Sequence, residues 1–228
     1  MKKVRVALIG SAGRMGRTIA DCALSESNID IVAQCDQGDD IVAGIKESDV
    51  IIDFSLADSI GDVCQAALSH RQALVIGTTG HSDQQKATIQ DAAKSLAIVF
   101  ASNFSVGVNA LFALTARAVQ VLGDDFNVEI IETHHTGKKD APSGTAKTLA
   151  EVLKKAGKTE KQIPIQSIRE GDVVGEHTVI FEAQGERLEL VHRAKSRETF
   201  AKGALRAAEW VVGQPPGLYD MQDVLGLK

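Results

Sequence analysis

The chain has few cysteines and no Cys-x-x-Cys pair. Its three cysteines, Cys22, Cys35 and Cys64, lie far apart in a sequence of 228 residues. An odd number of widely spaced thiols gives neither a disulfide framework nor the ligand spacing of a structural zinc site. The given sequence also shows no apolar signal segment at its start. We therefore expect a cytoplasmic protein.

The chain also lacks an excess of basic residues. It carries 25 Lys and Arg against 30 Asp and Glu, a formal net charge of −5. Because nucleic-acid binding needs a basic face, this balance argues against nucleic acid as the main partner. The hydrophobic fraction of 44% and the charged fraction of 24% are ordinary for a globular chain, so they disfavour disorder, collagen-like repeats and membrane spanning.

A short apolar run, a glycine turn and a helix are predicted at the start of the chain. The turn contains Gly10, Gly13 and Gly16. A helix N-terminus after such a turn presents unpaired N–H groups to a pyrophosphate, which favours a dinucleotide site. In the usual G-x-G-x-x-G spacing the later glycines would fall at Ala12 and Met15, so a plain tight turn is the alternative.

An acidic residue ends the second predicted strand, residues 29–35. Asp36 lies where a carboxylate would bind the ribose hydroxyls of a dinucleotide, and an ordinary loop aspartate is the alternative. Gln37 follows, where an arginine would favour the 2′-phosphate of NADP. We therefore expect NADH to be favoured over NADPH.

Strands and helices alternate up to residue 100. Strands are predicted at residues 50–54, 73–76 and 97–100, with helices near residues 59–69 and 82–95. Apolar strands separated by amphipathic helices indicate an α/β domain with a Rossmann-like, doubly wound parallel sheet. Ligands bind at the carboxyl ends of such strands, where this chain has polar or small-residue loops.

The pattern changes after Ser105. Helices are predicted at residues 109–122 and 144–156, and strands at residues 127–132, 165–168, 177–182 and 188–193. Consecutive strands with few helices between them suggest a second, α+β domain with a mixed or antiparallel sheet. A last amphipathic helix, residues 198–212, is expected to rejoin the first domain. The predicted domains are therefore residues 1–105 with 197–228, and residues 106–196, joined by a hinge near Ser105.

One polar segment, residues 132–146, begins where an apolar run stops and ends where a helical pattern starts, so packing does not explain it. It contains His134, His135, Lys138 and Lys139. Histidine is suited to donating a proton near neutral pH, and a lysine fixes a negative group or lowers the pKa of a neighbouring imidazolium. The alternative is a solvated loop.

The end of the polar segment predicts a carboxylate-binding helix start. Ser143 is expected to cap a helix that begins at Gly144. The N–H groups of Gly144 and Thr145 would then be available to an anionic substrate.

Metal and serine-hydrolase chemistry are both discounted. Adjacent histidines on an extended segment, such as His134 and His135, point to opposite sides, and no third ligand is spaced to help, so no metal is expected. The chain has no Gly-x-Ser-x-Gly turn, which leaves no exposed serine nucleophile to build on.

Taken together, these motifs resemble the 4-hydroxy-tetrahydrodipicolinate reductase (dihydrodipicolinate reductase) family. The resemblance covers nearly the whole chain and is carried by residues 10–16, 77–80, 103–109, 132–145, 174–178 and 217–221. It implies hydride transfer from NADH or NADPH to a cyclic imine dicarboxylate on the diaminopimelate route to lysine. It also implies a homotetramer assembled through the sheets of the second domains, which would bind substrate.

The resemblance implies roles for individual residues. His134 would be the proton donor and Lys138 its catalytic partner, with His135, Gly144 and Thr145 as substrate contacts. The implied dinucleotide site comprises Gly10, Ser11, Ala12, Gly13, Arg14, Met15, Asp36, Gly77, Thr78, Thr79, Ala101, Ser102, Asn103 and Phe104.

Two other functions share part of this pattern. One is another two-domain nicotinamide oxidoreductase of amino-acid metabolism, of the aspartate dehydrogenase type. The other is a sensor that binds NADH without turnover.

Overall fold

The computed structural model describes residues 3–158 and 163–228 and divides the chain into two compact units. The first comprises Met1–Phe104 and Glu198–Lys228, and the second Ser105–Arg197. Each junction lies one residue from the one predicted from the sequence.

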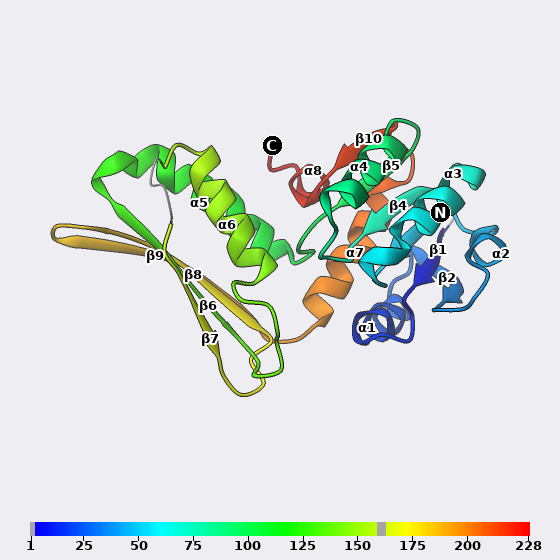
Figure 1. Cartoon of the computed structure of the whole chain (residues 1–228), viewed down its shortest axis with the longest axis horizontal. Helices are drawn as coiled ribbons and strands as arrows, with labels where there is room; N and C mark the ends of the chain where they lie inside the picture. The colour runs from blue at the N-terminus through cyan, green and yellow to red at the C-terminus, as the bar shows by residue number, and fades with distance from the viewer. Residues whose placement is uncertain (1–2, 159–162) are drawn as a thin grey trace. The chain divides into compact units, whose positions relative to one another are not determined.

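The first unit contains a parallel sheet of six strands among the described residues (Figure 1). These are β1 (Val4–Ile9), β2 (Ile29–Cys35), β3 (Val50–Asp53), β4 (Ala73–Ile76), β5 (Ala97–Phe100) and β10 (Gly217–Tyr219). Their order is β10-β5-β4-β3-β1-β2, so the winding direction reverses between β1 and β3. In open α/β sheets, ligands bind outside the carboxyl ends of the strands at such a reversal.

Helices cover both faces of this sheet. Side chains from α1 (Arg14–Ala23), α7 (Glu198–Val211) and α8 (Met221–Leu225) form one apolar cluster with the strands, and α2 (Ile41–Ile45), α3 (Ile60–His70) and α4 (Asp83–Ala92) form the other. Along β1, Val6 and Leu8 enter the first cluster, and Ala7 and Ile9 the second. This alternation confirms the predicted doubly wound fold.

In the second unit, the described residues form a mixed four-stranded sheet (Figure 1). Its elements are α5 (Val106–Leu122), β6 (Asn127–His134), α6 (Gly144–Lys155), β7 (Ile165–Arg169), β8 (Gly175–Ala183) and β9 (Glu186–Ala194). The strand order is β7-β6-β8-β9, with β7 parallel to β6 and the other pairs antiparallel. Helices α5 and α6 pack together with β6 and β8 in one core, which confirms the predicted α+β architecture.

Helix α5 begins three residues before the predicted start at residue 109. The side chain of Ser105 accepts a hydrogen bond from the backbone N–H of Val108 (3.3 Å), which caps the helix N-terminus. The segment Val106–Asp125 is long and apolar enough to pass a length-and-composition test for a membrane span. One face of α5, which includes Leu111 and Phe112, packs in the core of the second unit, and 33% of this apolar window is buried.

Candidate functional site

In the first unit, the predicted cofactor residues follow the carboxyl ends of four strands. Gly10 follows β1, Asp36 follows β2, Gly77 follows β4 and Ala101 follows β5. Because the strands are parallel, these ends lie at one edge of the sheet. Phe104 and Ala101 are buried, Asn103 is half-buried, and Thr79 and Ser102 are exposed.

The glycine turn needs glycine for steric reasons. Gly10 has a φ of +80°, and a Cβ there would stand 2.5 Å from the Phe54 carbonyl oxygen. A Cβ on Gly16 would stand 2.2 Å from the Gly10 carbonyl oxygen. The unusual glycine spacing therefore matches close backbone approaches where the turn enters α1, whose first residues are Arg14 and Met15.

Asp36 lies against the glycine turn. Its carboxylate accepts hydrogen bonds from the Ser11 hydroxyl (2.5 Å) and the Ala12 backbone N–H (2.9 Å). Gln37, the next residue, is exposed. The end of β2 and the glycine turn thus form one polar surface.

A buried carboxylate joins the loops after β3 and β4. Asp53 is fully buried and accepts hydrogen bonds from the hydroxyl groups of Ser55 and Thr78, the latter at 2.9 Å. Burial raises the pKa of Asp53, against the opposing effect of these hydrogen bonds. The sequence pattern predicts Asp53 near the end of a strand but does not predict that its carboxylate links the two loops.

Phe54 determines how closely these loops approach one another. A Cβ on Gly77 would stand 2.1 Å from the Phe54 ring, and the Phe54 and Phe104 ring centroids are 5.7 Å apart. A side chain at position 77 would displace the aromatic pair. Gly77 and Phe104, both predicted cofactor residues, therefore pack around Phe54.

In the second unit, β6 extends two residues beyond the predicted strand and includes His134. Glu132 and His134 lie two positions apart and are both buried, with exposures of 0% and 8%. The first residues of the polar segment therefore lie in the buried end of the strand and not in a loop. His135, just past the strand end, is half-buried.

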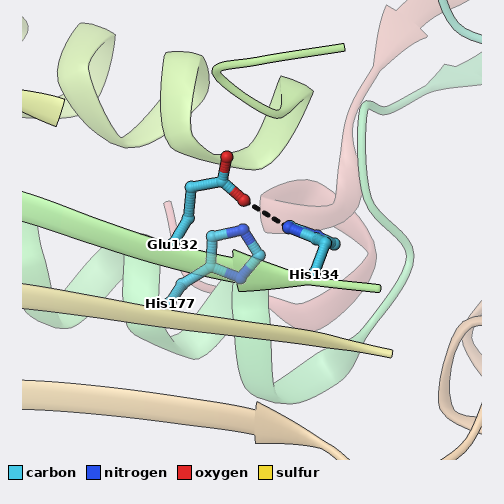
Figure 2. Close-up of side chains that lie close together, drawn as sticks. All are labelled: Glu132, His134 and His177. Carbon is cyan, nitrogen blue, oxygen red and sulfur yellow. Dashed lines mark hydrogen bonds and ion pairs between the residues drawn. The ribbon is translucent and has the colours of Figure 1, made fainter. Parts of the chain in front are cut away.

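Glu132 contacts His134 directly. Its carboxylate is hydrogen-bonded to Nδ1 of His134 (Figure 2). The same carboxylate accepts a hydrogen bond from the guanidinium of Arg169 (3.0 Å) and one from the backbone N–H of Ser143 (3.4 Å). Burial would raise the pKa of Glu132, but hydrogen bonds from Arg169, Ser167 and His134 hold it below its ordinary value.

His177 completes the cluster from β8, where it is paired opposite Glu132. Its ring centroid is 5.1 Å from that of His134, and its Nε2 lies 3.2 Å from the Ser143 hydroxyl. Burial lowers the pKa of His177 to about 3 and also lowers the pKa of His134, although Glu132 opposes the latter shift. His177 is therefore neutral near pH 7.

Glu132, His134 and His177 have ligand-type atoms within 4.8 Å of one another, a group that could hold a metal ion. This corrects the expectation that no third ligand is available, because His177 comes from a strand that sequence spacing does not reveal. However, the Arg169 guanidinium already binds the Glu132 carboxylate, and a second cation there would be repelled. We therefore assign no metal role to this cluster.

The loop after His135 is held by one ion pair and one hydrogen bond to its backbone. Lys138 Nζ lies 2.7 Å from the Asp140 carboxylate, and the Arg169 guanidinium donates to the Asp140 carbonyl oxygen (2.6 Å). Lys138 is half-buried, whereas Lys139 is exposed. Of the two lysines, the predicted catalytic one is the more enclosed.

Ser143 caps helix α6, as predicted. Its hydroxyl accepts a hydrogen bond from the Ala146 backbone N–H (3.2 Å). Gly144 and Thr145 are the first two residues of the helix; Gly144 is exposed and the Thr145 side chain is buried. These two predicted substrate contacts thus lie at the positive end of the helix dipole.

Sequence reasoning did not assign Glu132, Arg169 and His177 to the site. Glu132 could have been found, because it lies two residues before His134 at the end of a strand. Arg169 lies 37 positions from Glu132, and only the pairing of β6 with β7 brings the two together.

A glycine turn at the carboxyl edge of a doubly wound sheet, joined to an α+β unit with a buried His–Glu pair, defines a two-domain nicotinamide oxidoreductase. The family model described as dihydrodipicolinate reductase, N-terminus, matches residues 4–104, and the C-terminus model matches residues 107–225. The chain therefore belongs to the dihydrodipicolinate reductase family, now called 4-hydroxy-tetrahydrodipicolinate reductase, and it is an NAD(P)H-dependent oxidoreductase.

Individual relatives agree with the family match. The chain is 46% identical to a 4-hydroxy-tetrahydrodipicolinate reductase of Akkermansia muciniphila, over 98% of both chains. It is 42% identical to that of Hahella chejuensis, over 98% of this chain and 99% of the relative. A dipicolinate-bound dihydrodipicolinate reductase from Paenisporosarcina sp. TG-14 has the same fold, with a TM-score of 0.79 at 24% identity, covering 97% of this chain and 98% of that one.

Proposed function

We propose that the chain reduces 4-hydroxy-tetrahydrodipicolinate to tetrahydrodipicolinate in the diaminopimelate route to lysine. The observation that carries the proposal is the buried His134–Glu132 pair, with Lys138 and the α6 N-terminus nearby, in a chain whose two halves both match this family. Such a cluster supplies a proton donor and groups for an anionic substrate.

The cofactor site is assigned to the first unit. The glycine turn, from Gly10 to Met15, would receive the pyrophosphate, since it leads into the N-terminus of α1, where unpaired N–H groups favour an anion. Asp36 would bind the ribose. Gly77–Thr79 and Ala101–Phe104 would hold the nicotinamide ring, which supplies the hydride when bound.

We propose that NADH is the preferred cofactor. Asp36 presents a carboxylate beside the glycine turn, and a 2′-phosphate there would meet its negative charge. The neighbouring Gln37 offers no positive charge to compensate.

The substrate site is assigned to the second unit. His134 would donate the proton, and Lys138 would stabilise negative charge on the substrate. His135 and the first turn of α6, at Gly144 and Thr145, would hold the substrate carboxylates, since a helix N-terminus favours an anion.

We further propose that the protein is a cytoplasmic homotetramer assembled through the sheets of its second units. Strand β9 is an edge strand and leaves Leu188 and Val191 more than one third exposed, which supports pairing with another copy. The buried free thiols of Cys22, Cys35 and Cys64 fit a reducing compartment. Sedimentation of the protein and of Val191→Glu would test the assembly: loss of tetramer only in the variant would support it.

The activity is tested by following the absorbance of NADH, and separately of NADPH, after adding the fresh condensation product of aspartate semialdehyde and pyruvate. We expect oxidation of both cofactors, with a higher kcat/KM for NADH. No oxidation of either cofactor would overturn the proposed activity. Equal or greater efficiency with NADPH would overturn only the cofactor preference.

A further inference from the structure

Glu132 is a buried carboxylate in a position that packing alone would fill with an apolar residue. Val128 and Ile130 precede it on the inner face of β6, and both belong to the core of the second unit. Burying a carboxylate is costly unless it is paired and hydrogen-bonded. Its ion pairs with His134 and Arg169 offset the free energy of burial, and the carboxylate places a fixed negative charge at the end of the strand.

The contact between Glu132 and His134 determines which ring nitrogen can react. Nδ1 of His134 is occupied by the Glu132 carboxylate (Figure 2). A carboxylate in that place accepts the Nδ1 hydrogen, so the proton available for transfer must be on Nε2. Nε2 faces Gly175, and a Cβ on Gly175 would stand 3.1 Å from it, so glycine there avoids crowding this nitrogen.

We infer that Glu132 is the positioning residue of the proton donor: its carboxylate fixes the His134 ring through Nδ1–H and leaves Nε2 to deliver the proton. This inference rests on the proposed function and deepens it. The Nε2–H bond of the imidazolium breaks as the substrate takes up the proton that accompanies the hydride. The ring becomes neutral with its Nδ1–H still on Glu132, the carboxylate stays ionised, and solvent restores the proton on Nε2.

The charges around His134 make the Glu132 carboxylate necessary for this role. The groups that face His134 are Glu132 of β6, Arg169 of β7, His177 of β8, and Lys138 and Asp140 of the loop. Burial, Lys138 and Arg169 all lower the pKa of His134, whereas Glu132 raises it. Without Glu132, the charged form of His134 would face two cations in a buried place and would lose its proton at a lower pH.

Glu132 also fixes the loop that carries Lys138. Arg169, held by the Glu132 carboxylate, donates to the carbonyl oxygen of Asp140, and the Asp140 carboxylate pairs with Lys138. The Ser143 N–H at the start of α6 is a further donor to Glu132. One carboxylate thus links the proposed proton donor, the lysine and the helix start.

The test compares Glu132→Gln with Glu129→Gln, which makes the same chemical change at an exposed position of the same strand. We expect Glu132→Gln to lower kcat on the order of a hundredfold. The descending limb of its pH–kcat profile should move to lower pH, because His134 then loses its proton at a lower pH. Glu129→Gln should have the kcat and the pH profile of the parent. NADH affinity should be unchanged in both variants, since the cofactor site is assigned to the other unit.

A measurement on the unaltered protein covers the case in which Glu132→Gln fails to fold. Nitrogen-15 NMR of the histidine rings, with His134 assigned through His134→Gln, should show the neutral ring protonated at Nδ1. A neutral ring protonated at Nε2, or a Glu132→Gln enzyme with kcat and pH limb close to those of the parent, would overturn the inference. Full activity of His134→Gln would also overturn the inference, because His134 would then not be the proton donor. No oxidation of NADH or NADPH by the unaltered protein would instead overturn the proposed function, so the two failures are distinguishable.

Discussion

At the scale of single residues, the two adjacent lysines of the polar loop provide a matched test of the proposed site. Lys138 is half-buried and paired with Asp140, while Lys139 is exposed. We expect Lys138→Ala to lower kcat/KM on the order of a hundredfold, because it removes an anion anchor or proton donor beside His134. Lys139→Ala should stay within about threefold of the parent, as expected for an exposed residue outside the site. Steady-state kinetics with both variants measures this, and equal effects would contradict the assignment of Lys138.

Cofactor preference is also a residue-scale property. Gln37→Arg should raise kcat/KM with NADPH by about tenfold or more, because a guanidinium beside the ribose binds a 2′-phosphate. Asp36→Asn should weaken binding of NADH, since the amide is a poorer acceptor for two hydroxyls. Fluorescence titration with both cofactors gives the dissociation constants. If Gln37→Arg leaves the preference between NADH and NADPH unchanged, the cofactor ribose does not bind beside residue 37.

The residues of the polar segment also show what the sequence could and could not predict. His134 and Lys138 were recognisable because their types are unusual beside a turn, and Ser143 because it precedes a helical pattern. The sequence pattern predicts Glu132 only as the first residue of the segment, because the apolar run of the strand stops there. Its burial depends on Arg169, which a local pattern cannot supply.

At the scale of elements, the sequence predicts β3, β4 and β5 although each has only four residues, because an uninterrupted apolar run makes up all or nearly all of each. It does not predict α2, α8 and β10, which have three to five residues each and contain polar or small residues. Such lengths leave too few apolar positions to define a period. The start of α5 was missed because it depends on the Ser105 cap rather than on the apolar pattern.

Two helical glycines test how the returning helix α7 is packed. A Cβ on Gly203 would stand 1.8 Å from the Phe104 carbonyl oxygen, whereas Gly61 of α3 has nothing within 4 Å. Gly203→Ala should lower the free energy of unfolding by about 1–3 kcal/mol or more through overpacking. Gly61→Ala should raise it by about 0.4–1 kcal/mol, because alanine restricts the unfolded chain and favours helix.

Urea unfolding followed by tryptophan fluorescence measures both glycine variants. The single tryptophan, Trp210, lies in α7 against Tyr219 and therefore reports on the first unit. Similar midpoints for Gly203→Ala and Gly61→Ala would contradict the close approach of α7 to Phe104.

At the scale of the whole molecule, the two units have one property in common: both bury histidines. Burial lowers the pKa of His81 in the first unit and of His134, His177 and His192 in the second. Because each of these pKa values is lower in the folded protein, the unfolded chain binds more protons than the folded one once the pH falls below 6.5, the ordinary pKa of histidine. The neutral histidines therefore stabilise the fold fully above pH 6.5, and this stabilisation is lost as the pH falls toward their lowered pKa values.

His177 should dominate this acid sensitivity. Its pKa falls from 6.5 to about 3, so its contribution declines throughout that interval. Linkage gives a loss of about 2 kcal/mol from this residue alone between about pH 7 and about pH 5, a range that lies above the titration of ordinary carboxylates. Urea unfolding at the two pH values, followed by circular dichroism, measures the loss.

His177→Gln should reduce the pH dependence of the unfolding free energy by about 2 kcal/mol over this range, whatever its effect at about pH 7. His70→Gln, at an exposed position of α3, should leave that pH dependence as in the parent. If His177→Gln unfolds with the same pH dependence as the parent, the imidazole of His177 takes up its proton in the folded protein, and the neutral state assigned to it beside His134 is wrong.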